Sequence, residues 1–134
     1  MTVRFNEAEI GARVMQGVKQ GIVAVTEGVR NEAISLILTG PKTGRIYRRR
    51  SVEHQASAPG EAPASDTGRL VNSIRTRYEN DYMTGIVAAS TAYATVLEFG
   101  TLKMEPRPFM RPALARKRDG IKSTITQFVR AALA

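Results

Sequence analysis

The strongest constraint on the fold is a long apolar stripe in the first third of the chain. Aliphatic residues recur there at steps of three and four, which is the spacing of one face of an α-helix. The stripe consists of Ile10, Val14, Val18, Ile22, Val25, Val29, Ala33 and Leu36. We therefore expect one long helix against which the rest of the chain packs.

Local signals mark both ends of this helix. Asn6 is a suitable N-cap, and the acidic residues that follow it favour the positive N-terminal end. Gly40-Pro41 is a typical stop. The interior contains Gly11, Gly17, Gly21 and Gly28, each of which costs about 1 kcal/mol relative to alanine. The helix must therefore depend on packing, and its glycines would let another backbone, such as that of a neighbouring subunit, approach closely.

Composition removes several classes of function. The chain has 134 residues, of which 43% are hydrophobic and 24% charged, as in a single globular domain. It has no cysteine and one histidine, His54, which excludes thiolate chemistry and a multi-histidine metal site within one chain. The sequence contains neither an apolar run of membrane-spanning length nor the apolar core of a signal peptide. We expect no cofactor, no metal, no membrane contact, and synthesis in the cytoplasm.

The remaining pattern predicts an α+β fold in a single domain, residues 1–134. Residues 44–50 predict a short strand with Ile46 facing inward, and residues 51–65 predict an extended loop that becomes ordered on assembly. Two strands of a hairpin are expected at 74–79 and 83–90. We expect this small antiparallel sheet to pack against the long N-terminal helix and a C-terminal helix.

Two further helices are expected in the C-terminal third. One covers residues 91–99, anchored in the core by Val96, Leu97 and Phe99. The last has Pro112 at its first position and a buried stripe formed by Leu114, Ile121, Ile125, Phe128 and Ala132. Phe109 is apolar in a charged turn and needs a pocket, either in its own core, which is the favoured interpretation, or in an adjacent subunit.

Two segments suggest catalysis, and neither is convincing. Asp66-Thr67-Gly68 matches the centre of an aspartic protease motif, in which two aspartates share a proton across a dimer. The adjacent Arg69 would lower the pKa of Asp66, which opposes proton sharing, so a capping role before a short helix is favoured. His54 has serines nearby but no nucleophile elbow. We expect no enzymatic activity.

The net charge of +8 makes a partner of opposite charge plausible. One basic group consists of Lys42, Arg45, Arg48, Arg49 and Arg50. It can be interpreted as a solvated edge strand, as a surface that pairs with acidic residues of a neighbouring subunit, or as a phosphate-binding surface. The first two together are favoured over specific DNA recognition. A second basic group at 107–118 is expected to be solvated surface.

Several segments together resemble one protein family. Residues 54–70 read HQASAPGEAPASDTGRL, residues 93–101 read YATVLEFGT, and Lys103-Met104 is followed by RPFMRPAL at 107–114. These motifs and their order resemble the gene-product-ten-like neck, head–tail connector and tail-completion family of long-tailed bacteriophages. The resemblance covers roughly residues 7–133.

The resemblance implies a structural virion protein located at the neck or tail end and assembled in the host cytoplasm. It implies a homo-oligomeric ring, a hexamer or larger, that binds other neck and tail proteins. A basic lumen in such a ring would allow contact with passing DNA without reading its sequence. Candidate interface or lumen residues are Arg45, Arg48, Arg49, Arg50, His54 and Phe109. The alternative hypothesis is a non-specific basic DNA-binding protein. An aspartic-protease-like dimer ranks third.

Overall fold

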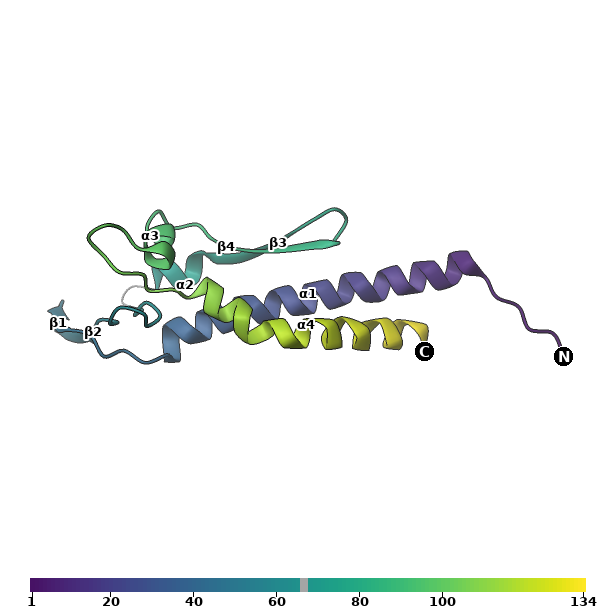
Figure 1. The fold of residues 1–134 in the computed structure, drawn as a ribbon, viewed down its shortest axis with the longest axis horizontal. Helices are drawn as coiled ribbons and strands as arrows, with labels where there is room; N and C mark the ends of the chain where they lie inside the picture. The colour runs from purple at the N-terminus through teal and green to yellow at the C-terminus, as the bar shows by residue number, and fades with distance from the viewer. Residues whose placement is uncertain (66–67) are drawn as a thin grey trace.

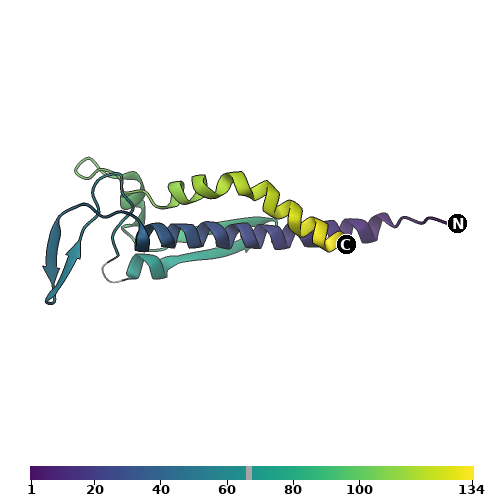
Figure 2. The same ribbon diagram turned by 90° about the horizontal axis from the view of Figure 1, so that it is seen from below.

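A computed structural model describes residues 1–65 and 68–134 and shows an elongated α+β domain built along one helix. Helix α1 (Glu7–Thr39) is the central element. Helix α4 (Met110–Leu133) and the hairpin of β3 (Ile74–Glu79) and β4 (Thr84–Ala89) both lie along it. The N-terminal arm extends from one end of the molecule, and the hairpin of β1 (Ile46–Arg49) and β2 (Val52–Gln55) lies at the other (Figures 1 and 2).

The predicted ends of α1 are confirmed. The side chain of Asn6 accepts a hydrogen bond from the Glu9 amide at 3.2 Å. At the other end, the Gly40 amide donates to the Leu36 carbonyl at 3.1 Å, and Pro41 follows. Gly40 has a φ of −67°, so the helix ends without a left-handed residue. Both ends therefore follow from local hydrogen bonding.

The apolar stripe of α1 is buried over only part of its length. Val29, Ala33 and Leu36 lie in the core, together with Ile37, whereas Ile10 is exposed. The other members of the stripe, Val14, Val18, Ile22 and Val25, are half-buried. The core therefore surrounds the C-terminal part of α1, and the first turns of the helix are exposed.

Two of the α1 glycines allow the close packing of α4. A Cβ atom on Gly17 would lie 2.6 Å from the Cα of Val129, and one on Gly21 would lie 2.8 Å from the Cα of Ile125. The predicted close approach of a second backbone is thus confirmed, and that backbone belongs to the same chain. Gly11 and Gly28 face open space.

Helix α4 differs from the prediction at its start. It begins at Met110, so Pro112 occupies the third helical position instead of the first. Ala113 is fully buried and Leu114 is 41% exposed, which makes the expected role of Leu114 in the buried stripe wrong. Leu114 borders an open pocket together with Val29 of α1 and Val87 of β4, which leaves its side chain partly exposed. Ile121, Ile125, Phe128 and Ala132 are half-buried.

The β3–β4 hairpin confirms the predicted strands. Ile74 pairs with Ala89 and Glu79 with Thr84 in an antiparallel register. Ile74 is fully buried, and its carbonyl accepts a hydrogen bond from Nε of Arg30 on α1 at 2.9 Å. Gly85 lies so close to Thr26 of α1 that a Cβ at that position would overlap the threonine hydroxyl. The hairpin is therefore held against α1 at several points.

The β1–β2 hairpin corrects two predictions. Residues 51–65 are not loop throughout, since Val52–Gln55 forms β2 and pairs with β1. Arg50 and Ser51 form the turn, with φ values of 50° and 65°, as a tight hairpin requires. Ile46 does not face inward but is 61% exposed, because this hairpin projects away from the core (Figure 2).

Candidate functional site

The junction between α3 (Ala94–Phe99) and α4 is organised by one carboxylate. Glu98 accepts backbone hydrogen bonds from Phe109 at 2.9 Å, Met110 at 3.0 Å and Arg111 at 2.8 Å. These amides form the first turn of α4, where helical N–H groups have no partner within the helix. Glu98 therefore caps α4 from a different helix, and its negative charge favours the positive end of the α4 dipole.

Glu98 is buried yet remains readily ionised. Burial raises the pKa of its carboxyl, but the backbone hydrogen bonds and the Arg111 side chain outweigh that effect, so the pKa lies below its usual range. Nε of Arg111 lies 3.2 Å from the carboxylate, and the guanidinium also packs 4.8 Å from the centre of the Phe99 ring. The three backbone amides and Arg111 together stabilise the buried negative charge of Glu98.

The turn between α3 and α4 depends on a glycine. Gly100 has a φ of 74°, and a Cβ at this position would approach the Met104 carbonyl to 2.7 Å. Thr101 Oγ1 accepts hydrogen bonds from the amides of Lys103 at 3.2 Å and Met104 at 3.1 Å. This turn directs the chain back so that the Arg107 amide donates to the Leu97 carbonyl at 2.6 Å.

The side chains that anchor this region only partly match the prediction. Phe109 is 2% exposed and lies in the core of its own chain, which confirms the favoured interpretation and removes Phe109 from the candidate interface residues. Val96 and Phe99 are exposed, so their expected core role is wrong. Ala94 and Glu98 are the buried residues of α3. Glu98 faces inward because its carboxylate binds the first amides of α4.

The segment after β2 is also fixed by a carboxylate. Glu61 accepts hydrogen bonds from the Thr43 hydroxyl, from the Thr43 amide at 2.9 Å and from the Ala58 amide at 2.8 Å. The Thr43 side-chain bond is the main reason that the pKa of Glu61 lies below its ordinary value. The Gly60 amide donates to the Pro106 carbonyl at 3.0 Å, which ties this segment to the turn before α4.

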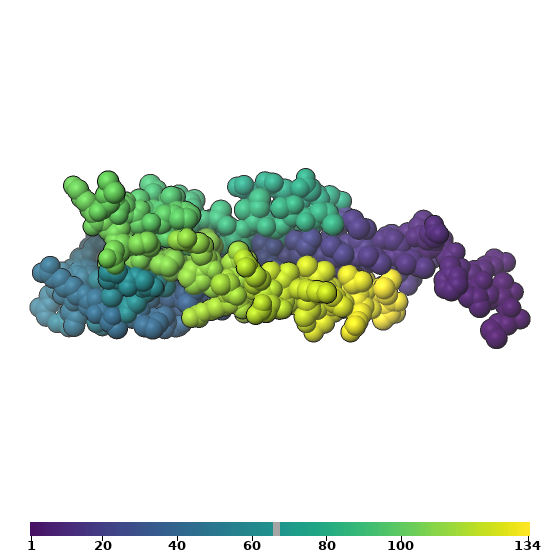
Figure 3. All heavy atoms as spheres, viewed as in Figure 1, coloured from purple at the N-terminus to yellow at the C-terminus, as the bar shows by residue number. Residues whose placement is uncertain are grey.

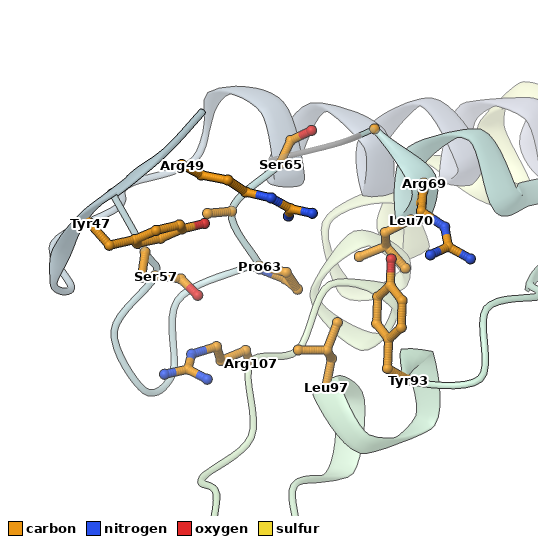
Figure 4. A pocket seen from close by; sticks show the side chains of 13 residues that line it. Tyr47, Arg49, Ser57, Pro63, Ser65, Arg69, Leu70, Tyr93, Leu97 and Arg107 are labelled. Atoms are coloured by element: carbon orange, nitrogen blue, oxygen red, sulfur yellow. The ribbon is translucent and has the colours of Figure 1, made fainter. Parts of the chain in front are cut away.

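These segments meet around a pocket of about 470 Å³, which we call the arginine pocket (Figure 4). Its walls come from β1, residues 56–65, the start of α2 (Arg69–Ser73), α3 and the turn before α4. The lining residues are Tyr47, Arg49, Ala56, Ser57, Pro63, Ala64, Ser65, Gly68, Arg69, Leu70, Tyr93, Leu97 and Arg107. The three motif segments noted in the sequence therefore converge on one cavity.

The lining chemistry suits binding better than catalysis. The pocket offers three guanidinium groups, two phenol rings and two serine hydroxyls. The described lining residues include no carboxylate and no imidazole that could act as a general base. The arrangement can attract and orient an anion, with Pro63, Leu70 and Leu97 as its apolar surface.

The predicted interface residues are not gathered in this pocket. Of the hairpin arginines only Arg49 lines it, while Arg45, Arg48 and Arg50 are exposed outside. Arg48 pairs with Glu53 at 3.4 Å. His54 is half-buried and stacks on Tyr47 with ring centres 5.6 Å apart.

The sequence interpretation missed Glu98 and treated Arg107 as solvated surface. The signal that could have located the pocket was the presence of arginine beside glycine and proline in residues 54–70, and of arginine beside proline in residues 107–114. Asp66, expected as an N-cap, lies outside the described residues. The helix that follows begins at Arg69 with Gly68, in a left-handed conformation, at the cap position.

No family model, no curated protein and no solved structure matches the chain. Within residues 1–65 and 68–134, no group of histidine and acidic side chains is arranged to hold a metal ion. The helices of the described part of the chain are all too short or too polar to cross a membrane.

Proposed function

We propose that this chain is a structural subunit of a tailed-phage virion and forms a ring at the head–tail junction, as a neck, head–tail joining or tail-completion component. The support from sequence is the resemblance of the three motif segments, in their order, to the gene-product-ten-like family. In the structure those segments pack together around Glu98 and the arginine pocket. If this chain and the gene-product-ten-like family share the fold at this end of the molecule, the similarity of their motifs is explained.

The observation that carries the assembly role is the uncovered apolar surface at the N-terminal end. Val3, Phe5, Ile10 and Met15 are all exposed, with Phe5 81% exposed. Figure 3 shows the arm and the start of α1 projecting beyond the rest of the chain. Large apolar side chains on such a projection suit contact with another subunit. A heterologous contact of this kind closes into a ring when its rotation is that of a closed point group.

The test is deletion of the coding sequence from the genome that carries it. We expect filled heads and free tails in place of joined particles, and restoration of joined particles by a plasmid copy. Electron microscopy counts of the three species measure the effect. Normal numbers of infectious, joined particles after deletion would contradict the proposal.

Non-specific DNA binding is the second candidate, and the exposed β1–β2 hairpin favours it. Arg45, Arg48 and Arg50 are exposed on this projecting element. Contact with phosphates predicts an affinity that falls linearly with the logarithm of salt concentration, with a slope of about −0.9 for each phosphate contacted. Replacing the three arginines with glutamine should flatten that slope. Titration of fluorescent duplex DNA at several salt concentrations distinguishes this activity from a purely structural role.

A further inference from the structure

We propose that the arginine pocket binds an acidic segment of a partner protein, with a carboxylate on Arg107 and an apolar neighbour against Leu97 and Leu70. The assignment of that partner to the virion rests on the proposed function. The binding of a carboxylate by the pocket does not, because it follows from the side chains that line it. The hydrogen bonds of the described part of the chain leave Nε of Arg107 and the side chain of Arg69 for a ligand.

The first observation is an unused donor inside the pocket. Nε of Arg107 is buried and has no hydrogen-bond partner in the described part of the chain. A buried donor left without a partner destabilises the folded chain, and a ligand that supplies the acceptor removes that cost. The backbone of Arg107 is held in place by its bond to Leu97, so the side chain starts from a fixed point.

A second cation belongs to the wall of the same pocket. Arg69 lines the pocket, and its side chain forms no hydrogen bond or ion pair in residues 1–65 and 68–134. Figure 4 shows Arg107 and Arg69 on opposite sides of Leu97, with Tyr93 beside Arg69. Arg49 also lines the pocket but has interactions of its own. Arg69 and Arg107 are therefore the two charges on which the binding of an anion depends.

The shape and lining of the pocket favour a protein segment over DNA. Pro63, Leu70 and Leu97 form an apolar surface between the two cations, which matches an amino-acid side chain and not a sugar–phosphate backbone. Arginine pairs with carboxylate and with phosphate alike through two parallel hydrogen bonds, in which Nε can be one of the donors, so the apolar surface is what distinguishes the two ligands. The arginines available to a DNA backbone are instead those exposed on the β1–β2 hairpin.

The experiment observes the Nε–H groups of the arginines directly by ¹⁵N NMR of the full chain. The probe is the peptide acetyl-Leu-Glu-Leu-Glu-amide, and the matched control replaces both glutamates with glutamine. Inorganic phosphate and a short DNA duplex are titrated separately. We expect the acidic peptide to shift the Arg107 and Arg69 Nε–H signals and the glutamine peptide to leave them unchanged.

Variants then locate the interaction. Arg107→Gln and Arg69→Gln should each weaken binding of the acidic peptide about tenfold. Arg107→Lys should restore part of the affinity, because it keeps the charge and loses the paired donors. Arg118→Gln, at an exposed position on α4, is the matched control and should bind like the wild type. Thermal melting of each variant verifies folding, and the wild-type titration decides the matter for any variant that does not fold.

Two results overturn the inference. If no probe shifts the Arg107 signal, the pocket is not an anion site. If duplex DNA shifts the Arg107 and Arg69 signals at lower concentration than the acidic peptide does, the pocket belongs to a DNA-binding surface. Neither result affects the deletion experiment. If deletion abolishes head–tail joining but no probe binds the pocket, only the inference about the pocket is rejected. Peptide binding with normal particles after deletion would reject only the virion role.

Discussion

The carboxylate of Glu98 accepts a hydrogen bond from the amide of Phe109 at 2.9 Å, and Phe109 is both the N-cap residue of the last helix and a residue whose ring fills the core. Helix capping and core packing therefore meet at Phe109. The Glu-Phe-Gly-Thr and Arg-Pro-Phe motifs, which are separate in sequence, form one structural unit through this contact. Changes in either motif should affect the same region.

Replacing Glu98 with alanine should destabilise the chain by about 2–3 kcal/mol. The loss combines the cap of α4 with amide groups left without an acceptor in a buried position. Glu105→Ala is the matched control, because Glu105 is an exposed carboxylate in the same turn. Urea denaturation followed by circular dichroism measures both. Equal midpoints for the two variants would contradict the capping role.

The stabilisation by Glu98 should depend on pH. Its folded pKa lies below the unfolded value of 4.5, so the stabilisation is present in full above about pH 5 and decreases as pH falls through the folded pKa. The difference in Tm between wild type and Glu98→Gln should therefore shrink in acid. Glu61 is present in both proteins, so its own lowered pKa cancels in the comparison. A difference that grows below pH 4.5 would show that the sign is wrong.

Phe109→Ala should cost about 3–5 kcal/mol, because the ring is fully buried in its own chain. Phe99→Ala is the control, since that ring is 62% exposed, and should cost much less. Melting curves of the purified variants give both values. A normal melting temperature for Phe109→Ala would mean that the ring does not anchor the monomer.

Adding one methyl group to α1 should have opposite effects at different glycines. Gly17→Ala and Gly21→Ala should each destabilise by about 1–3 kcal/mol, because the new Cβ would meet the α4 backbone. Gly28→Ala faces open space and should stabilise by up to about 1 kcal/mol through helix propensity. Chemical denaturation of the three variants compares them. Stabilisation at all three positions would contradict the observed packing of α4.

Polar replacements at the N-terminal end should separate folding from assembly. Phe5→Ser and Ile10→Ser alter exposed side chains, so the free energy of unfolding of each variant should lie within about 0.5 kcal/mol of the wild-type value. Under the proposed function, complementation of the gene deletion by these variants should yield few joined particles. The purified wild-type chain should sediment as a monomer or weak oligomer. A stable ring in dilute solution would instead show that assembly needs no partner.

Local sequence signals predicted the elements of this fold well, and tertiary contacts were harder to anticipate. The helix α1 and the β3–β4 hairpin were predictable, because periodicity and turn residues act over a few positions. The inward orientation of Ile46 was wrong, since nothing local indicates that its hairpin projects from the core. The predicted burial of Leu114 was also wrong, because its spacing does not reveal that this part of the α4 face borders an open pocket.

The candidate site was predictable in its parts and not in its assembly. The motif segments were recognisable, but the sequence does not reveal that Glu98 reaches the start of another helix. A carboxylate that lies 11 to 13 positions before the amides that it caps has no local signature. Arg107 was interpreted as surface for the same reason, since its burial depends on residues 56–65 folding over the turn.

The length of α1 has a mechanical consequence for any assembly that contains this chain. A continuous helix of 33 residues spans about 50 Å, at a rise of about 1.5 Å per residue. It places the exposed arm and the arginine pocket toward opposite ends of one rod. The helix therefore sets both the distance between the two contact regions and their relative orientation about the helix axis. Inserting one residue would lengthen it slightly and rotate one region about 100° relative to the other, so neighbours matched to the original phase could no longer bind both.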